Sequence, residues 1–241
     1  MKQVINIVVD IETLSLQSDA AIVSIAAVPF NPYGEIPKGD EPVEFGVFDV
    51  YMRNEEDGFA IIGEEGYFYE VINATSCALA GMDFEKETIV WWEKKNEETK
   101  ADLLTRTPMN IGEAINAFHN YLEGLKSAYN AEIKVWSQGS DFDFPILQNA
   151  YRKTMGKVKF PWMYDYKRDA RTHVLEKLEK FYGVEEKPYE RIPKLPERFK
   201  GVSHNSLYDA RRTAWGIAYV NRLCPSISGA STSSTTPKSS E

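Results

Sequence analysis

The sequence predicts an α/β fold in which a mixed β-sheet is flanked by helices on both faces. Strand-like apolar runs joined by turn residues fill the N-terminal third, and helical and strand-like segments alternate after it. The chain has 241 residues, 43% of them apolar, so it is long enough for one sizeable α/β domain and too short for two of ordinary size. These observations predict an antiparallel N-terminal meander that continues into parallel strands.

The meander is predicted to contain three strands. Residues 4–10, VINIVVD, indicate a buried central strand, and residues 20–30 and 45–52 indicate the second and the third. Residues 31–39, which contain several Pro and Gly, supply the turns between the last two strands. Such short connections between consecutive strands favour antiparallel pairing.

A long amphipathic helix is predicted within residues 107–125, where Asn110 is available as the N-cap. Its apolar face would contain Ile111, Ala114, Ile115, Phe118, Leu122 and Leu125. Residues 132–137, EIKVWS, then indicate a short strand, and residues 143–153 indicate a second helix.

Two more helices complete the predicted fold. One covers residues 170–183 and ends at Gly183, and the last covers residues 206–223. The buried side of the last helix is expected to contain Leu207, Ala210, Ala214, Ile217 and Val220. Helices that alternate with strands in this way cover both faces of a sheet.

The folded domain is expected to cover residues 1–224, followed by a disordered Ser/Thr-rich tail at residues 225–241, where ten of 17 residues are Ser or Thr. No stretch approaches the roughly 18 consecutive apolar residues of a membrane helix, and no signal-peptide pattern is present. Cys77 and Cys224 lie far apart and have no metal-ligand spacing. We therefore expect a soluble, cytoplasmic protein without a membrane partner.

Acidic and basic residues are unevenly distributed along the chain. Residues 1–150 contain 10 Lys or Arg against 26 Asp or Glu, whereas residues 151–222 contain 17 against 9. The asymmetry favours a polyanionic ligand held by the basic part and cations gathered by the acidic part. A solvated surface of drifting composition explains the same numbers, so charge alone does not decide between them.

Two carboxylates stand at the end of the first predicted strand, in the segment VVDIETLSL. Asp10 and Glu12 are two residues apart and therefore face the same side of a strand. Beside an apolar core, two unpaired carboxylates repel each other and lose hydration, and a divalent cation would offset this penalty. The alternative is that the strand ends here and both acids are solvated, because a D-x-E triplet is frequent by chance.

Three later residues would complete a metal site. Asp143 precedes Phe144 and Pro145 where a strand meets a helix, whereas His204 lies in a loop and Asp209 in the first turn of the last helix. Each acid has an ordinary explanation, because Asp is a good N-cap and acids near helix N-termini complement the helix dipole. Their order along the chain, D-x-E, then Asp, then His-x-x-x-x-Asp, favours one shared site.

The motifs VVDIETLSL, WSQGSDFDFPILQNAYRK and SHNSLYDARRTA resemble those of the DEDD 3′-to-5′ exonucleases, in their histidine-bearing DEDDh branch, which has a ribonuclease H-like fold. The resemblance covers roughly residues 4–222. TIVWWEKK and YKRDART are similar to segments of the tailed-phage exonuclease A and of the exonuclease VIII or ribonuclease AS type. Asn205 stands where the tyrosine branch has Tyr, which excludes that branch.

The resemblance implies a two-metal active site with a general base. His204 would take a proton from the attacking water. Two Mg²⁺ ions, for which Mn²⁺ would substitute, would be held by the metal-binding and catalytic acids Asp10, Glu12, Asp143 and Asp209.

The resemblance also implies contacts with the substrate. Thr13 and Leu14 would meet the terminal 3′-hydroxyl and the last base. Independently of the resemblance, Trp92 is our candidate for stacking on a base. Arg168 is our candidate for holding the phosphate backbone, beside Arg171 and the basic residues of the Pro-rich segment KPYERIPKLPERFKG, for which a solvated loop is the alternative. Adjacent helical residues point about 100° apart, so one residue of the Trp91–Trp92 pair is expected to be buried.

The predicted function is a 3′-to-5′ exonuclease that releases nucleoside 5′-monophosphates from single-stranded DNA or 3′ overhangs. The alternatives are the same enzyme acting on RNA 3′ ends, a nucleic-acid-binding module without catalysis, and an interaction protein whose D-x-E is accidental. Gln138 and Lys95 stand where Asn and Gln are expected, which leaves the substrate contacts open. Whether the chain forms a homodimer also stays open.

Overall fold

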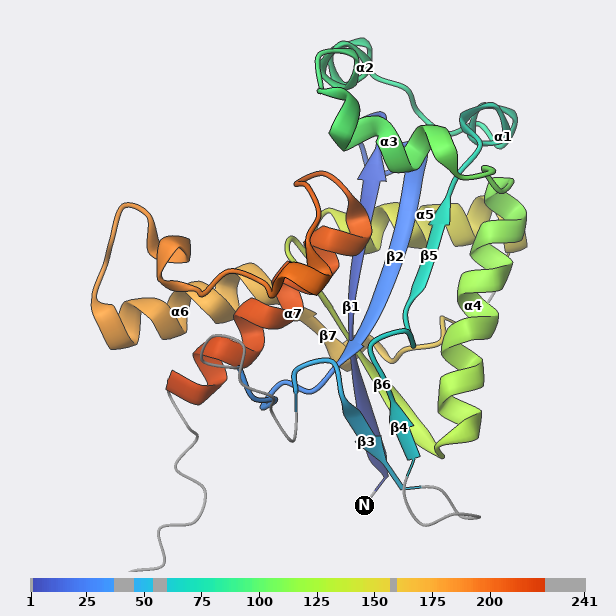
Figure 1. Cartoon of the computed structure of the whole chain (residues 1–241). Helices are drawn as coiled ribbons and strands as arrows, with labels where there is room; N and C mark the ends of the chain where they lie inside the picture. The colour runs from blue at the N-terminus through green and yellow to red at the C-terminus, as the bar shows by residue number, and fades with distance from the viewer. Residues whose placement is uncertain (1, 37–45, 54–59, 157–159, 224–241) are drawn as a thin grey trace, which may run out of the picture.

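A five-stranded sheet with the order β5-β2-β1-β6-β7 forms the centre of the fold (Figure 1). The computed structural model describes residues 2–36, 46–53, 60–156 and 160–223. The strands of the sheet are β1 (Gln3–Thr13), β2 (Ile22–Phe30), β5 (Phe68–Val71), β6 (Ala131–Ser137) and β7 (Lys167–Asp169). β2 is antiparallel to β1 and to β5, whereas β6 and β7 run parallel to β1. The predicted mixed sheet, with antiparallel and parallel strands, is therefore confirmed.

One predicted strand lies elsewhere. The segment 45–52 was expected to complete the meander, but Val50–Met52 forms β3, which pairs with β4 (Ala60–Ile62) in a separate two-stranded sheet. Residue 45 itself lies outside the described residues. The antiparallel partner of β2 is β5, which buries Phe68, Tyr69 and Val71 against the cores of the sheet. This larger apolar contact explains why β5, and not the three-residue β3, occupies that edge.

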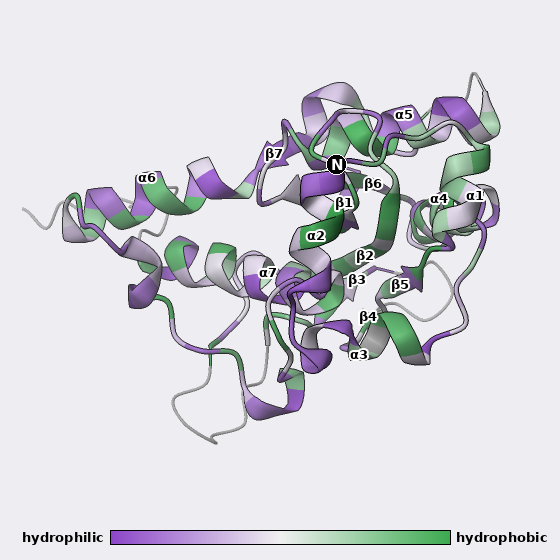
Figure 2. Ribbon diagram, turned by 90° about the horizontal axis from the view of Figure 1, so that it is seen from above, coloured by the Kyte–Doolittle hydropathy of each residue, from purple (hydrophilic) through white to green (hydrophobic). Residues whose placement is uncertain are grey.

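Helices cover both faces of the sheet, as predicted (Figure 1). On one face α4 (Ile111–Ala128) and α5 (Asp143–Met155) contribute to the first core, together with Ile5, Ile7 and Val9 of β1. On the other face α6 (Ala170–Tyr182) and α7 (Ser206–Leu223) contribute to the second core. The central strands are mostly hydrophobic, whereas α6 alternates between hydrophobic and hydrophilic residues (Figure 2).

The predicted helices agree with the structure in place and orientation. α4 begins after Asn110, which occupies the N-cap position, and buries the predicted face apart from Leu125, which is only partly buried. α6 ends at Gly183, whose φ of 83° is in the left-handed region. All five residues predicted for the buried side of α7 are buried.

Shorter elements lie near the C-terminal end of β1. They are α1 (Ala74–Leu79), α2 (Lys86–Glu93) and α3 (Glu97–Thr105), and the later loops contain the 3₁₀ helices η1 (Tyr164–Tyr166), η2 (Pro188–Arg191) and η3 (Glu197–Phe199). Cys77 is buried in α1. Cys224 and the predicted tail at 225–241 lie outside the described residues. In the described part of the chain, none of the helices has the length and hydropathy needed to span a membrane.

Candidate active site

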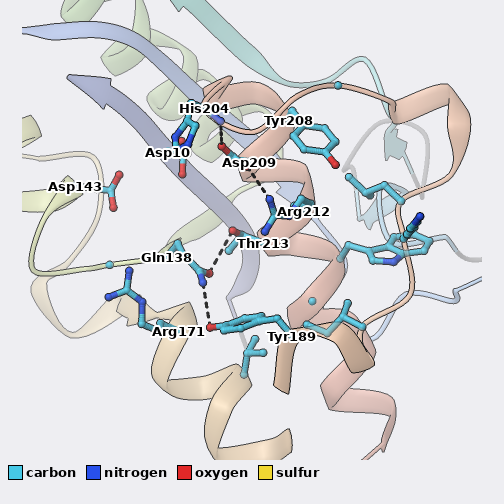
Figure 3. Close-up of a pocket in the computed structure, with 18 of the residues that line it drawn as sticks. Asp10, Gln138, Asp143, Arg171, Tyr189, His204, Tyr208, Asp209, Arg212 and Thr213 are labelled. Atoms are coloured by element: carbon cyan, nitrogen blue, oxygen red, sulfur yellow. Dashed lines mark hydrogen bonds and ion pairs between the residues drawn. The ribbon is translucent and has the colours of Figure 1, made fainter. Parts of the chain in front are cut away.

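The four predicted acids converge on one place, although they come from three separate elements. Asp10 and Glu12 lie near the end of β1, Asp143 is the first residue of α5, and Asp209 lies in the first turn of α7. Asp10, Asp143 and Asp209 surround a common space in Figure 3. All four acids line the same pocket. Burial raises the pKa of Asp10, and the negative charges of Asp143, Glu12 and Asp209 raise it further.

The central position of β1 fixes the first two acids. β1 pairs with β2 as far as Thr13, but its parallel pairing with β6 ends at Val8. Past Val8, the backbone N–H of Ile11 therefore faces away from any strand and donates instead to Asp143 Oδ1, at 3.3 Å. This bond ties α5 to the end of β1. Asp143 consequently does not act as the N-cap of α5, a position that Phe142 occupies.

The loop before α7 positions the fourth acid. The backbone N–H of His204 donates to Asp209 Oδ2 at 2.6 Å, and Arg212 Nη1 donates to Asp209 Oδ1 at 3.3 Å. The start of the helix is fixed to the sheet by a buried hydroxyl pair, Ser206 Oγ and Ser24 Oγ, at 2.9 Å. Asp209 is thereby held beside β1.

Burial raises the pKa values of all four carboxyl groups, and repulsion by neighbouring carboxylates adds to the rise at Asp10 and Glu12. Burial is the largest cause for all four. It raises the pKa of Glu12 to about 8 and that of Asp143 to about 7, and the pKa values of Asp10 and Asp209 are also raised. Lys95 opposes the rise at Glu12, and Arg212 opposes it at Asp209. The carboxylates of the site are therefore not fully neutralised by nearby basic residues. Divalent cations that prefer oxygen ligands would supply the missing positive charge.

His204 lies at the edge of this cluster. Candidate ligand atoms of Glu12, His204 and Asp209 lie within 4.8 Å of one another. The φ of His204 is 69°, a left-handed conformation, and its ring meets the ring of Trp91 edge-on with centroids 4.7 Å apart. Burial, and secondly the charge of Lys95, lower the pKa of His204, so the imidazole is neutral near pH 7 and can accept a proton.

The predicted substrate residues at the end of β1 have inward-facing contacts. Thr13 is buried, and its hydroxyl donates to the Ser15 carbonyl at 2.7 Å. Leu14 is partly buried against the first core. Trp92, predicted to stack on a base, is only 7% exposed and donates its indole N–H to the Thr13 carbonyl at 2.9 Å. Of the tryptophan pair, it is Trp91, 39% exposed, that offers its ring at the surface.

Arg168, predicted to hold the phosphate backbone, lies in the edge strand β7. Its guanidinium donates to the carbonyls of Asp165 and Lys167, at 2.6 and 2.8 Å, and it does not line the pocket that contains the acids. Arg171, the second residue of α6, lines that pocket instead. The sequence predicted a basic residue here but did not distinguish between the two arginines.

A pocket of about 780 Å³ begins at the carboxylates and extends between α6 and α7 (Figure 3). Sequence reasoning did not assign pocket positions to Tyr189, Thr213 and Trp215, which line it. The Pro-rich segment KPYERIPKLPERFKG, rich in basic residues, was the available signal, because it supplies much of the outer wall of the pocket. The residues that this segment contacts are far from it in the sequence, so the spacing of residues along the chain did not predict these contacts.

The chain is similar in sequence to known nucleases. A family model described as the 3′-5′ exoribonuclease Rv2179c-like domain matches residues 5–221. The exodeoxyribonuclease of Enterobacteria phage T4 is 23% identical over 152 residues, which make up 61% of this chain and 56% of that protein. The chain thus spans little more than half the length of that relative.

Two solved structures are also similar. A zinc-bound complex of E. coli exonuclease I with single-stranded DNA aligns with a TM-score of 0.48 and 10% identity, over 92% of this chain and 40% of that chain. A product-bound structure of exonuclease I aligns with a TM-score of 0.47 and 11% identity, over 92% of this chain and 43% of that chain.

Proposed function

We propose that this chain, which belongs to the family of Rv2179c-like 3′-5′ exoribonuclease domains, hydrolyses nucleic acid from its 3′ end and releases nucleoside 5′-monophosphates. The convergence of Asp10, Glu12, Asp143 and Asp209 beside His204 is the observation that carries the proposal. Cleavage of a phosphodiester requires an attacking hydroxide and stabilisation of charge on the leaving 3′ oxygen.

The four acids are proposed to hold two Mg²⁺ ions, for which Mn²⁺ would substitute. Their donor atoms are all oxygens, the ligand type that these ions prefer, and their raised pKa values indicate uncompensated negative charge. When bound, such a pair supplies activation of water and stabilisation of the leaving oxygen. Asp143, fixed to Ile11, and Asp209, fixed to His204, would keep their carboxylates in place before metal binds.

His204 is proposed to act as the general base. Its lowered pKa keeps the ring neutral near pH 7, and its loop position beside Glu12 and Asp209 brings it to the edge of the acid cluster. The ring would accept the proton of the attacking water. Trp91 packs against the ring and limits its orientations.

Single-stranded DNA and 3′ overhangs are our first candidate substrates, and RNA 3′ ends are the second. The phage relative is named an exodeoxyribonuclease, which supports DNA. The description of the matched family names an exoribonuclease, which supports RNA. Carboxylates that hold metal ions against phosphate oxygens do not read the sugar, so contacts with the 2′ position must decide.

The proposal is tested with 5′-labelled single-stranded DNA, single-stranded RNA of the same sequence, and duplexes with 3′ overhangs, each incubated with the protein and MgCl₂. We expect a ladder that shortens from the 3′ end, stops with EDTA, and is absent for the double variant Asp10→Asn, Glu12→Gln. If no substrate is cleaved in either Mg²⁺ or Mn²⁺, or if the double variant cleaves like the wild type, the proposal fails.

A further inference from the structure

The basic residues of the C-terminal part differ in whether an acid already neutralises them. Arg191 pairs with Glu185, and Arg198 pairs with Glu64 at 2.7 Å. Within the pocket wall, Arg212 pairs with Asp209 at 3.3 Å. Arg171 also lines the pocket, but in the described part of the chain no acid lies within ion-pair distance of its guanidinium. Arg171 is therefore a basic side chain at the pocket that keeps its charge for a ligand.

An aromatic ring is fixed next to this arginine. Tyr189, in η2, lines the same pocket, and its hydroxyl accepts a hydrogen bond from Gln138 Nε2 at 3.1 Å. Gln138 Oε1 accepts in turn from Thr213 Oγ1 at 3.4 Å. These two hydrogen bonds connect η2, the end of β6 and α7, and Figure 3 shows them as dashed lines. Arg171 and Tyr189 line the same side of the pocket in Figure 3. Burial raises the pKa of Tyr189, and the hydrogen bond from Gln138 and the charge of Arg171 oppose the rise.

The described acids near Arg171 do not form an ion pair with it. Nη2 of Arg171 lies 3.6 Å from the position that a Cβ would occupy at Gly139, and Asp141 Oδ1 lies 3.7 Å from the same position, but the two side chains are not paired. Asp169, the nearest acid along the chain, is engaged as the N-cap of α6, where it accepts from Thr172 and from Ser140. The carboxylate of Asp169 therefore binds backbone N–H groups and not the guanidinium of Arg171.

We propose that Arg171 and Tyr189 form a second nucleotide subsite, in which Arg171 binds the phosphate and Tyr189 stacks on the base immediately upstream of the bond that is cleaved. The inference rests on the proposed exonuclease function. The resemblance places the terminal nucleotide at Thr13 and Leu14, which do not line the pocket, and the scissile phosphate at the acids. The remaining strand then continues past the acids into the pocket, where a charge and a ring match a phosphate and a base.

The subsite is tested with two substrates. One is a single-stranded oligonucleotide, and the other is the 4-nitrophenyl ester of thymidine 5′-monophosphate, which contains a scissile phosphate but no upstream nucleotide. We expect Arg171→Gln and Tyr189→Ala to lower kcat/KM for the oligonucleotide by about 5- to 100-fold, the usual range for lost stacking. For the ester, both variants should keep a kcat/KM within about twofold of the wild-type value. Tyr189→Phe keeps the ring and should restore most of the activity on the oligonucleotide.

Salt dependence identifies the phosphate contact. Loss of one contact should reduce the slope of log(kcat/KM) against log[salt] by about 0.7 for Arg171→Gln on a single strand. Lys180→Gln is the matched control, because Lys180 is exposed on the same helix, does not line the pocket and carries the same charge. It should leave the slope and both rates unchanged.

Three outcomes would overturn the inference. In the first, Arg171→Gln and Tyr189→Ala both cleave the oligonucleotide with a kcat/KM within twofold of the wild type. In the second, these variants lower kcat/KM equally for the oligonucleotide and for the ester. In the third, Lys180→Gln reproduces the change in the salt-dependence slope. A wild-type protein that hydrolyses neither substrate would instead overturn the proposed exonuclease function. The ester therefore separates failure of the subsite from failure of the active site.

Discussion

Replacement of His204 should affect the rate of cleavage but not the stability of the fold. Because the four acids remain, His204→Ala should leave the fold and Mg²⁺ affinity nearly intact, yet lower single-turnover cleavage by about 10²- to 10⁴-fold. The measurement is single-turnover cleavage at saturating MgCl₂, with a Mg²⁺-dependent thermal shift as the test of binding. Near wild-type cleavage by His204→Ala would remove the histidine from the mechanism.

The conformation of His204 makes Asn the better second substitution. The φ of 69° is a left-handed conformation that Asn tolerates well, so His204→Asn removes the titratable ring with little backbone strain. Since burial and Lys95 lower the pKa of His204, the wild-type rate should rise with pH below about 6.5, the ordinary histidine value, as the ring loses its proton. The rate of His204→Asn should be flat over the same range.

Replacement of Glu12, unlike that of His204, should change the stability of the protein, because the negative charge of Glu12 destabilises the folded state when no metal is bound. Glu12→Gln removes one of the crowded negative charges, so in EDTA at pH 8.5 the variant should melt a few degrees higher than the wild type. The stabilisation by Mg²⁺ and the cleavage should both decrease strongly. Glu93→Gln, an exposed substitution in α2, is the control and should change neither. A lower melting temperature for Glu12→Gln would contradict the repulsion.

At the scale of elements, α2 supports the end of β1 through Trp92. Trp92→Phe keeps a buried ring but leaves the Thr13 carbonyl without its indole donor, which should destabilise the protein by about 1 to 3 kcal/mol. Urea unfolding measures this loss. Trp91→Phe, on the exposed neighbour, should change stability by less than about 0.5 kcal/mol. Equal effects of the two substitutions would show that the hydrogen bond does not stabilise this contact.

The elements that were predicted from sequence are those with local patterns. The apolar spacing of α4 and α7 defined their buried faces, and the order of the motifs identified the four acids. β7 was missed because its three residues, Lys167–Asp169, are all charged and become a strand only by pairing with β6. The sequence could not show which of Trp91 and Trp92 is exposed, or which of Arg168 and Arg171 lines the pocket, because neighbouring residues of one type differ only in the tertiary contacts that they make.

At the scale of the whole molecule, the raised pKa values couple stability to pH. The folded protein keeps protons on Glu12 and Asp143 up to about pH 8 and 7, whereas the unfolded chain loses them near the ordinary values of 4.5 and 3.8. These groups therefore favour folding at low pH, and their contribution is lost as the pH rises through about 7 to 8.

The pH dependence is measured by urea unfolding in EDTA from pH 5 to pH 9. The free energy of unfolding of the wild type should decrease relative to that of Glu12→Gln as the pH rises, and MgCl₂ should reverse the decrease because metal binds the deprotonated carboxylates. A difference between the two proteins that grows in favour of the wild type at high pH would contradict the raised pKa of Glu12.

The convergence of acids from β1, α5 and α7 has a consequence for the time at which the protein becomes a nuclease. The proposed ligands are at positions 10, 12, 143 and 209, so the last one is added only after all five strands of the central sheet have been synthesised. A nascent or truncated chain that ends before residue 204 has neither His204 nor Asp209, whatever else has folded. Under the proposed function, an unfinished chain therefore lacks both the general base and one of the four metal-binding acids.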